Sequence, residues 1–511
     1  DNANSIVREG LSIVGLSNTN VFLNQFGISV IPNLITVPGR VLDEPRVLYK
    51  DNKFAQVRFG SWNMADVKFN TRATVKRWSY LMISLDTYQD AFDRVSLAAA
   101  VKHFTETLVK TGISVATPLP GQRLELDSPE DTRLDQRLEA AAQTLELLLV
   151  ILPDAITPLY NRIKHCGDIR YGIHTVCSVG HKFAKCSDQY FANVALKFNL
   201  KLGGNNQLLD ASRRSLIDED KTMVVGIDVT HPSPGSAPSA PSIAGMVASV
   251  DRWLGQWPAV LRIQSKARKE MVSDLSDMLK SRLRLWKDPG RGKHANLPEN
   301  ILVYRDGVSE GQYQTVLDEE VPLLRQACQD MYPPADQKKG LPRLTVVVVG
   351  KRHHTRFYAS REGDADRSSN PKPGTVVDRG VTESRNWDFF LQSHAAIQGT
   401  ARPAHYFVLL DEIFRARYAR TVPPPFQNVA DVLEALTQSM CYTYGRATKA
   451  VSVCTPAYYA DVVCERARCY LSGAFDTPSQ SAAGSVSAEP AVVRSEDVLI
   501  HARLRDSMFY I

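Results

Sequence analysis

The sequence predicts an α/β protein of two domains, the first doubly wound and the second built on a mixed sheet. Short apolar runs of strand length alternate with amphipathic stretches of helix length from residue 76 onward, and this pattern is typical of strands joined by covering helices. A turn at Gly203-Gly204-Asn205-Asn206 and a polar stretch at 210–221 interrupt the alternation. We therefore expect a boundary between two domains there.

The bulk composition is that of a globular protein, with 44% hydrophobic and 23% charged residues in a chain of 511, long enough for two or three domains. The net charge of +6 is too small to establish a nucleic-acid partner, so that argument depends on where the basic residues fall. Eight cysteines without zinc spacing predict reduced thiols and a cytoplasmic location.

No apolar run approaches the roughly 18 residues of a membrane span, so no membrane partner is expected. Residues 1–10 have the pattern of neither a signal peptide nor a transit peptide, and we expect them to be the interior of a longer protein. Residues 1–75 consist of short apolar runs broken by Pro, Asn and Gly, with little helical periodicity. This composition predicts a linker that lies along a neighbouring domain.

The first domain, residues 76–204, is expected to be a doubly wound sheet. The predicted elements are a strand at Trp78–Leu85, helices at Leu97–Lys110 and Leu134–Leu145, and a buried parallel strand at Leu147–Leu152. Ligands of such sheets bind beyond the carboxyl ends of the strands. There the loop 153–158 leads into a helix, with Thr157 as the expected cap and Pro158 at its first position.

Basic residues gather around this junction between loop and helix. Tyr160 and Lys164 are one turn apart and share a helix face, and a helix expected at Asp188–Leu202 carries Lys197 and Lys201 four residues apart. A tyrosine and three lysines beside a helix terminus predict an anion site. Taken singly, each lysine could instead belong to a solvated helix face, and the tyrosine ring to the core.

The second domain, residues 205–511, is expected to contain three consecutive strands followed by alternating units. The order is a strand from Met223, strands at Ser242–Val250 and Ala259–Gln264, a helix at Lys269–Leu285, a strand at Ile301–Arg305, a helix at Gln312–Met331 and a strand at Leu344–Gly350. This order suits a mixed sheet of the ribonuclease H type. Residues 476–493, rich in Ser, Ala, Gly and Pro, are expected to form a surface loop, and 422–425 a turn or extended strip.

Three acidic residues lie where strands or helices would bring them together. Asp228 and Asp306 each follow an apolar strand, and Asp461 lies in a helix announced by Thr455 as cap and Pro456. A buried aspartate needs a cation or several donors, although Asp228 alone could instead cap the following turn. Three convergent carboxylates predict a two-magnesium site for phosphoryl transfer.

Four motifs resemble the signature blocks of the PIWI domain of eukaryotic Argonautes, including those of the fungal quelling type. They are Gly226-Ile227-Asp228-Val229-Thr230-His231-Pro232, Tyr304-Arg305-Asp306-Gly307-Val308-Ser309-Glu310-Gly311, Lys351-Arg352-His353-His354-Thr355-Arg356 and Pro456-Ala457-Tyr458-Tyr459-Ala460. The resemblance covers nearly the whole chain. It implies a linker at 1–75, a Rossmann-like MID domain at 76–204 and a ribonuclease H-like PIWI domain at 205–511, without the N-terminal and PAZ domains.

The resemblance implies the ligands of two Mg²⁺ (or Mn²⁺) ions, namely Asp228, Asp306 and Asp461, with Glu270 as the fourth catalytic acid. Many members of the family have His where this chain has Asp461. Because this change keeps an oxygen ligand, which magnesium accepts, we expect activity to be retained. Without the resemblance, Glu270 could simply be an acid in the first turn of its helix, favoured by the helix dipole.

The resemblance also implies a pocket for the 5′-phosphate of a guide RNA. Its expected residues are Tyr160, Lys164, Thr175, Lys197 and Lys201 from MID, with Arg446 and Arg466 from PIWI. Many members have Gln after Thr175 where this chain has Val176, and Thr175 is the substitute. Tyr160 would also stack on the first base, beside a base-reading loop at 153–158. Taken alone, Arg466 could pair with an acid on its own helix.

Two further blocks are expected to line the guide-strand channel. Their residues are Lys351, Arg352, His353, Arg356, Gln398, Thr400 and Arg402. Donors of these kinds position a nucleic-acid backbone and carry little sequence information, although a plain surface charge cluster is the other interpretation. The apolar end of the chain, residues 507–511, is expected to lie between the domains.

The function implied is small-RNA-guided silencing, with a guide RNA, a complementary target RNA and silencing proteins on PIWI as partners of a monomer. One alternative is a silencing scaffold that binds a guide without cutting, which a metal-dependent cleavage assay would distinguish. Another is a nuclease of the ribonuclease H or transposase class that needs no guide and has no preference for a 5′-phosphate.

Overall fold

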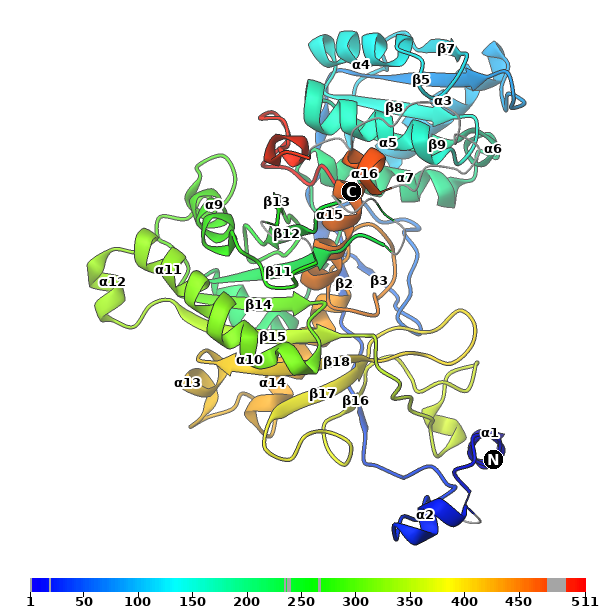
Figure 1. The fold of residues 1–511 in the computed structure, drawn as a ribbon. Coiled ribbons are helices and arrows are strands. Elements are labelled where there is room, and N and C mark those ends of the chain that lie inside the picture. The colour runs from blue at the N-terminus through cyan, green and yellow to red at the C-terminus, as the bar shows by residue number, and fades with distance from the viewer. Residues whose placement is uncertain (1, 18–19, 234–235, 237–239, 265–267, 476–492) are drawn as a thin grey trace.

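A computed structural model describes residues 2–511 except 18–19, 234–235, 237–239, 265–267 and 476–492. The chain forms a smaller and a larger sheet, each covered by helices, with the N-terminal segment running along both (Figure 1). None of the helices described in these ranges has the length and apolar character needed to cross a membrane. The surface loop expected at 476–493 lies, apart from its last residue, outside the described residues.

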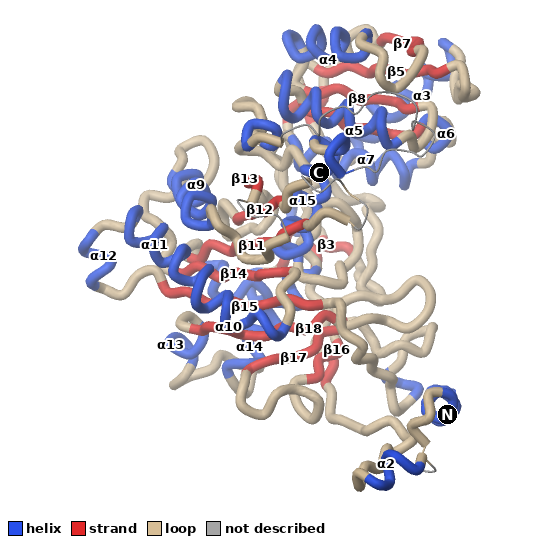
Figure 2. The backbone as a smooth tube through the Cα atoms, viewed as in Figure 1, coloured by secondary structure: helices blue, strands red, loops and turns tan. Residues whose placement is uncertain are grey.

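The N-terminal segment is more structured than the sequence predicted. It contains α1 (Asn2–Ile13) and α2 (Val21–Gln25), so the expectation of little helix was wrong for these residues. The side chain of Asn20 caps α2 by accepting the backbone N–H groups of Phe22 and Leu23. Beyond α2 the segment rises along the larger sheet mostly as loop (Figure 2).

Short strands fasten this segment to both domains. β1 (Arg40–Val41) pairs with β16 (Thr375–Val377), and β2 (Val47–Leu48) lies between β3 (Phe54–Ala55) and β10 (Leu208–Leu209). β4 (Thr74–Val75) pairs with β6 (Ser114–Val115). Because β10 pairs with the linker, the domain boundary at residue 205 stays a prediction.

The smaller sheet has the order β7-β5-β8-β9, with all strands parallel. The bounds are β5 (Trp78–Leu85), β7 (Gln122–Leu126), β8 (Leu147–Leu152), β9 (His174–Val179), α3 (Arg94–Lys110), α4 (Arg133–Thr144), α5 (Thr157–His165), α6 (Gly180–Phe183) and α7 (Asp188–Lys201). Every residue of β8 is buried, as its apolar run predicted. α4 and α5 pack on one face and α3 and α7 on the other, so the doubly wound prediction is confirmed.

The larger sheet has the order β1-β16-β17-β18-β15-β14-β11-β12-β13. Its other strands are β11 (Thr222–Thr230), β12 (Ile243–Ala248), β13 (Ala259–Ile263), β14 (Asn300–Asp306), β15 (Arg343–Gly350), β17 (Trp387–Gln392) and β18 (Ala404–Asp411). β14 runs parallel to both β11 and β15, and the other neighbours are antiparallel. The mixed sheet of the ribonuclease H type is therefore confirmed.

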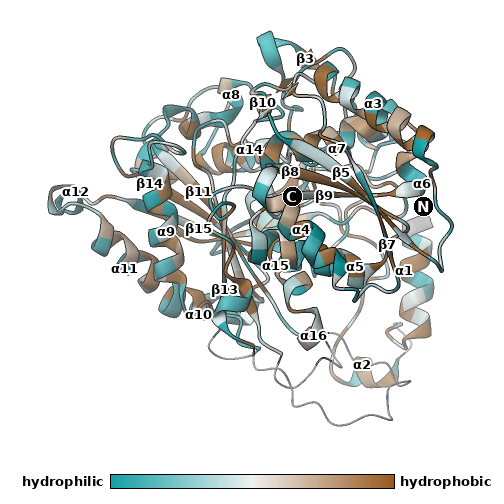
Figure 3. Cartoon of the chain, turned by 90° about the horizontal axis from the view of Figure 1, so that it is seen from above, coloured by the Kyte–Doolittle hydropathy of each residue, from teal (hydrophilic) through white to brown (hydrophobic). Residues whose placement is uncertain are grey.

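Helices cover both faces of this sheet. They are α8 (Ala211–Arg214), α9 (Leu275–Lys287), α10 (Tyr313–Thr315), α11 (Val321–Met331), α12 (Pro334–Lys338), α13 (Phe414–Tyr418), α14 (Val429–Cys441), α15 (Thr455–Tyr470) and α16 (Ser472–Phe475). α9 and α11 bury their apolar sides against one face, and α14 and α15 against the other. Figure 3 shows β8 and β11 in the brown of hydrophobic residues, enclosed by helices with teal outer faces.

Three details of the helices differ from the predictions. The helix expected from Lys269 begins only at Leu275, and the helix expected at 312–331 contains a π-helical turn at Val316–Glu320. Thr157 and Thr455 are the first residues of α5 and α15 and make no side-chain cap. The hydroxyl of Thr455 donates instead to the carbonyl oxygen of Met440 at 2.7 Å, because it is fully buried and needs an internal partner.

Candidate functional site

Three aspartates come from neighbouring elements of the larger sheet. Asp228 lies near the end of β11 and Asp306 ends β14; these strands are parallel and adjacent, with Ile227 paired to Arg305, so both acids lie at the same edge. α15 crosses β11 so closely that a Cβ at Gly226 would overlap the carbonyl oxygen of Pro456. This close packing brings Asp461, on the second turn of α15, toward the other two.

The three carboxyl groups share one electrostatic environment. Burial, followed by the charge of Asp228, raises the pKa of both Asp306 and Asp461 to about 7. Burial also raises the pKa of Asp228, which is 7% exposed, while Arg305 and Arg352 act in the opposite direction. Carboxylates that are both buried and close to one another are stabilised by a nearby cation.

Glu270 joins this group from a loop, and the interpretation as a first-turn acid of α9 is wrong. Its Oε2 accepts a hydrogen bond from Nε2 of His231 at 2.7 Å, and its Oε1 lies 2.9 Å from the guanidinium of Arg305. A Cβ on Gly307, whose φ is +87°, would lie 3.2 Å both from Oε1 of Glu270 and from Oδ1 of Asp228. The loop therefore delivers Glu270 to the aspartates.

Sequence reasoning missed His231 and Arg305 as functional residues. His231 lies three residues after Asp228, and Arg305 directly precedes Asp306, so both were present in the motifs that indicated the site. Arg305 is fully buried and also pairs with Glu320 at 3.0 Å. The signal that could have found it is a charged residue within an apolar strand, which must have a buried partner.

Among the described residues, a different acidic cluster is packed more tightly. The carboxylate oxygens of Asp378, Asp431 and Glu434 lie within 4.8 Å of one another. The guanidinium of Arg40 fills the space between them, 2.8 Å from both aspartates and in contact with Glu434. This Arg40 socket attaches β1 to α14 and already has its cation. Among the described residues, the oxygens of Asp228, Asp306 and Asp461 form no equally tight group.

A second constellation lies beside the edge strand β9, near its first residues His174 and Thr175, so the expectation of an anion site beyond the carboxyl ends of the strands was wrong about the end of the sheet. Nζ of Lys164 donates to the carbonyl oxygen and to Oγ1 of Thr175 at 2.8 and 2.9 Å, and lies 5.3 Å from the ring centre of Tyr160. Nζ of Lys201 donates to the carbonyl oxygen of Phe509. The end of the chain therefore closes this pocket, and residues 507–511 are buried there as expected.

Arg466 reaches this pocket from α15. It pairs with Asp168 at 2.8 Å and not with an acid of its own helix, and it donates to the hydroxyl of Tyr160 at 3.3 Å. It also donates to the carbonyl oxygens of Phe509 and Tyr510 at 3.1 and 3.0 Å. Asp168, which is fully buried, is a functional residue that the sequence analysis missed.

The pocket holds an excess of positive charge. Burial, followed by the charges of Arg446 and Lys164, lowers the pKa of Lys197 to about 7. Burial and the charge of Lys201 lower the pKa of His174 to about 3. Cations that depress one another in this way are stabilised by an anion, and a phosphate would supply it.

The basic block after β15 lies beside the aspartates. Arg352 counters the raised pKa values of Asp228 and Asp461, and the pKa of Lys351 is lowered by burial and by Arg402 while Asp306 opposes this. Two residues turn inward: His353 donates to the carbonyl oxygen of Pro403, and Arg356 to carbonyl oxygens of its own loop. Arg352, Gln398, Thr400 and Arg402 are exposed.

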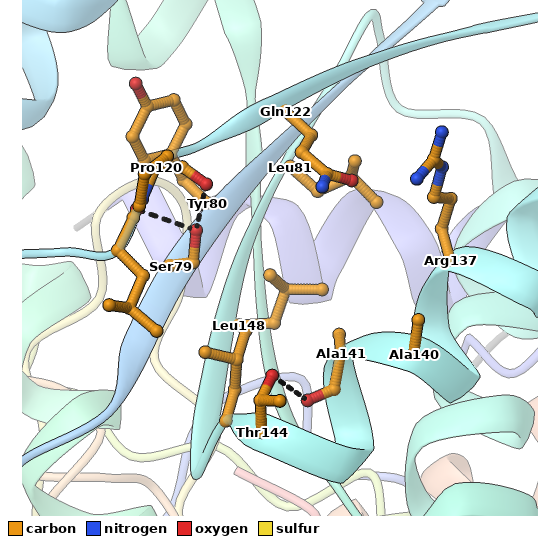
Figure 4. A pocket seen from close by; sticks show the side chains of 12 residues that line it. Ser79, Tyr80, Leu81, Pro120, Gln122, Arg137, Ala140, Ala141, Thr144 and Leu148 are labelled. Carbon is orange, nitrogen blue, oxygen red and sulfur yellow. Dashed lines mark hydrogen bonds between the residues drawn. The ribbon is translucent and has the colours of Figure 1, made fainter.

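Two hollows lie away from these residues. Figure 4 shows one of about 220 Å³ at the amino ends of β5 and β8, where Ser79 donates to the carbonyl oxygens of Leu119 and Pro120. A second, of about 770 Å³, continues from Tyr80 along α3. Neither hollow is lined by any of the predicted site residues.

Comparison with known proteins shows which family the chain is similar to. The Piwi domain model matches residues 147–472, and the Argonaute linker 2 domain model matches residues 1–49. The chain belongs to the Argonaute family. Among its relatives, Protein argonaute 5 of Arabidopsis thaliana is 36% identical over 95% of the chain and 48% of its own length. Protein argonaute 1B of Oryza sativa subsp. japonica is 36% identical over 93% of the chain and 42% of its own length.

Solved Argonaute structures share the fold. The C-terminal lobe of a budding yeast Argonaute superposes with a TM-score of 0.77 at 27% identity, over 93% of this chain and 95% of that chain. The MID-PIWI domains of N. crassa QDE-2 superpose with a TM-score of 0.63 at 33% identity, over 87% of this chain and 100% of that chain. The chain therefore has the architecture of an Argonaute MID-PIWI lobe, and it spans about half the length of the curated relatives it matches.

Proposed function

We propose that the chain performs the guide-binding and target-cleaving steps of small-RNA-guided silencing, as a cytoplasmic monomer that binds a guide RNA and its complementary target RNA. One observation supports this most strongly. Asp228 and Glu270 approach each other beside Gly307, and the charges of Asp228, Asp306 and Asp461 act on one another. A separate basic pocket lies beside the first residues of β9. Silencing proteins that dock on PIWI are further expected partners.

Asp228, Asp306 and Asp461 would hold two Mg²⁺ or Mn²⁺ ions. The donor set fits such ions, because all ligands are oxygens and burial and mutual repulsion raise the pKa values of the group. The ions supply an activated water and stabilisation of the leaving oxygen. Both oxygens of Glu270 have partners, Oε2 in His231 and Oε1 in the guanidinium of Arg305, so this carboxylate would be held beside the aspartates as the fourth acid of the site. The products are a 3′-hydroxyl and a 5′-phosphate.

The basic pocket would anchor the 5′-phosphate of the guide. Lys164 is held by Thr175, and Arg466 is held by Asp168 and by the backbone near the end of the chain, so these cations are in place before any ligand arrives. The exposed residues Arg352, Gln398, Thr400 and Arg402 would contact the guide backbone. Base pairing by the guide then selects the target, so the protein itself reads backbone and shape.

Titration of 5′-phosphorylated against 5′-hydroxyl RNA tests the pocket independently of catalysis. Replacing Lys164 and Lys201 by Ala should weaken binding of the phosphorylated RNA more than that of the unphosphorylated RNA, and equal losses would remove the pocket assignment. For cleavage, the full-length protein loaded with a guide should cut a fully paired target in Mg²⁺ or Mn²⁺. Asp306→Asn should stop cleavage and leave guide binding intact.

The same assays separate the alternatives. A guide-binding scaffold would hold the phosphorylated RNA and leave the paired target whole in either metal. A nuclease that needs no guide would cut without it and bind both RNAs equally. The intact set of four acids favours cleavage, and the preorganised cations of the pocket favour guide dependence.

A further inference from the structure

Among the contacts that fasten the loop that carries Glu270 is a buried hydroxyl group, that of Ser242. Ser242 directly precedes β12 and is fully buried. Its Oγ lies 2.8 Å from Nδ1 of His231 and accepts a hydrogen bond, also 2.8 Å long, from the backbone N–H of Arg268. His231 follows β11, and Arg268 lies two residues before Glu270. One hydroxyl therefore connects the strand that carries Asp228 to the loop that carries Glu270.

Counting protons assigns a direction to each of these hydrogen bonds. A serine hydroxyl has one proton. Its oxygen has two acceptor positions, so the bond from Arg268 does not by itself direct the proton. The carboxylate of Glu270 can only accept, so a neutral His231 carries its proton on Nε2, and Nδ1 is left to accept the hydroxyl proton of Ser242. A neutral imidazole that accepts at Nδ1 carries its proton on Nε2, and Nε2 is the atom 2.7 Å from Oε2 of Glu270. Ser242 thus favours the tautomer of His231 that can donate to Glu270.

The opposite tautomer would leave Glu270 without this donor. Nε2 would then turn a lone pair toward the carboxylate, which has acceptors only, and the 2.7 Å contact would become repulsive. The hydrogen bond from the N–H of Arg268 to Ser242 also helps to place Glu270. Arg268 has a φ of +62°, a conformation that non-glycine residues adopt only at a cost in free energy. Ser242 supports that turn two residues before Glu270.

Arg468 restrains the other end of this chain of contacts. It donates to the carbonyl oxygen of His231 at 3.2 Å and to Oγ of Ser233 at 2.9 Å. The imidazole therefore has a fixed backbone on one side and Ser242 on the other. With the ring so placed, a hydroxyl that donates to Nδ1 favours the tautomer in which Nε2 presents its N–H to Glu270.

We propose that Ser242 is a positioning residue for Glu270, acting through His231 and Arg268 without touching the RNA. This inference rests on the proposed cleavage function. Outer partners of this kind typically contribute 10- to 100-fold to the activity of the site that they orient, so Ser242→Ala should lower the single-turnover cleavage rate by about that factor. Affinity for guide and target should stay within about twofold, because neither RNA contacts the hydroxyl.

Ser249 supplies a matched control. It lies just beyond the other end of β12, is also fully buried, and accepts the backbone N–H of Val224 at 2.9 Å. Ser249→Ala removes an equivalent buried acceptor with no connection to Glu270, and it should leave the cleavage rate near that of the wild type. In a His231→Ala background, Ser242→Ala should have little further effect, because both changes interrupt the same route.

A spectroscopic measurement tests the inference without cleavage. In protein labelled with ¹⁵N at histidine, His231 should show the Nε2–H tautomer at about pH 8, where an ordinary imidazole is neutral, and Ser242→Ala or Ser242→Cys should shift it toward a mixture. An unchanged tautomer in both variants, or a Ser242→Ala rate equal to that of Ser249→Ala, would overturn the inference. A wild type that never cuts would instead refute the proposed function, and the tautomer would still decide the role of Ser242.

Discussion

Raising the pH from 7 to 8.5 should weaken binding of a 5′-phosphorylated guide through Lys197. In the free protein, burial and the charges of Arg446 and Lys164 lower the pKa of Lys197 from 10.5 to about 7. A phosphate dianion beside the ammonium group would restore its pKa toward the ordinary value. The lysine is therefore charged in the complex but only about half charged in the free protein at pH 7, and binding above pH 7 takes up a proton.

The magnitude follows from the charged fraction of the free protein. That fraction falls from about one half at pH 7 to about one eleventh at pH 8 and one thirtieth at pH 8.5. The affinity should then fall about 5-fold between pH 7 and 8 and about 15-fold by pH 8.5. The second pKa of a phosphate monoester is about 6, so the guide itself stays a dianion throughout. RNA with a 5′-hydroxyl should change by less than about twofold.

Fluorescence anisotropy of RNA labelled at its 3′ end measures both affinities, and calorimetry in buffers of different ionisation enthalpy counts the proton taken up. Lys197→Arg is the matched control, because a guanidinium does not lose its proton in this range. A wild-type affinity that stays flat from pH 7 to 8.5 would refute the reasoning. The same slope in the Lys197→Arg variant would assign the proton to another group.

Three further predictions test other contacts. Gly307→Ala places a Cβ 3.2 Å from two carboxylate oxygens in a backbone with φ +87°, so single-turnover cleavage should fall at least about 10-fold while guide affinity holds; an unchanged rate would contradict the geometry. Arg466→Met leaves the buried Asp168 without its cation and should cost about 3–5 kcal/mol in urea unfolding; a cost below about 1 kcal/mol would show that this pair matters little. Arg40→Met empties the socket that holds β1 and should cost about 1–3 kcal/mol, less than a fully buried pair because a third of the arginine is exposed. Trypsin should then cut the linker faster than in the wild type, and equal digestion would mean that strand pairing alone holds it.

The strands could be predicted well because a buried strand is a continuous run of apolar residues, which can be recognised in the sequence of that segment alone. β8 is apolar at all six positions, and the run before Asp228 is apolar or glycine, so either reads as a strand without any knowledge of its neighbours. The start of α9 was misplaced for the opposite reason. Residues 269–274 suit a helix by composition, but Glu270 is held outside a helix by His231 and Arg305, which are 39 and 35 residues away.

In the two candidate sites, too, the residues that belong to a local pattern were predicted, and those that depend on distant contacts were missed. Acids at strand ends and lysines at helical spacing indicated both constellations, since strand ends meet at one edge and one turn brings side chains together. Asp168 had no such signal, because it is a single acid after a glycine, in the short helical segment Cys166–Tyr171 between α5 and β9. Its importance comes from Arg466, 298 residues later, and from the hydroxyl of Tyr470 at 2.8 Å. Contacts across such separations depend on the tertiary fold and leave no local periodicity.

The two sites are joined by one rigid element, α15. Asp461 and Arg466 are five residues apart, which places them about 7.5 Å apart along the helix axis and on different faces. One face brings Asp461 to the aspartates of the larger sheet, and the other sends Arg466 into the basic pocket beside Tyr160. The first turn of α15 packs on Gly226, and Arg466 is tied to Phe509 and Tyr510, so the helix can neither slide nor rotate freely. In the proposed function, α15 would therefore set the separation between the anchored guide phosphate and the cleaving acids. An inserted residue between 461 and 466 would rotate one of them by about 100° and uncouple the sites even if each remained intact.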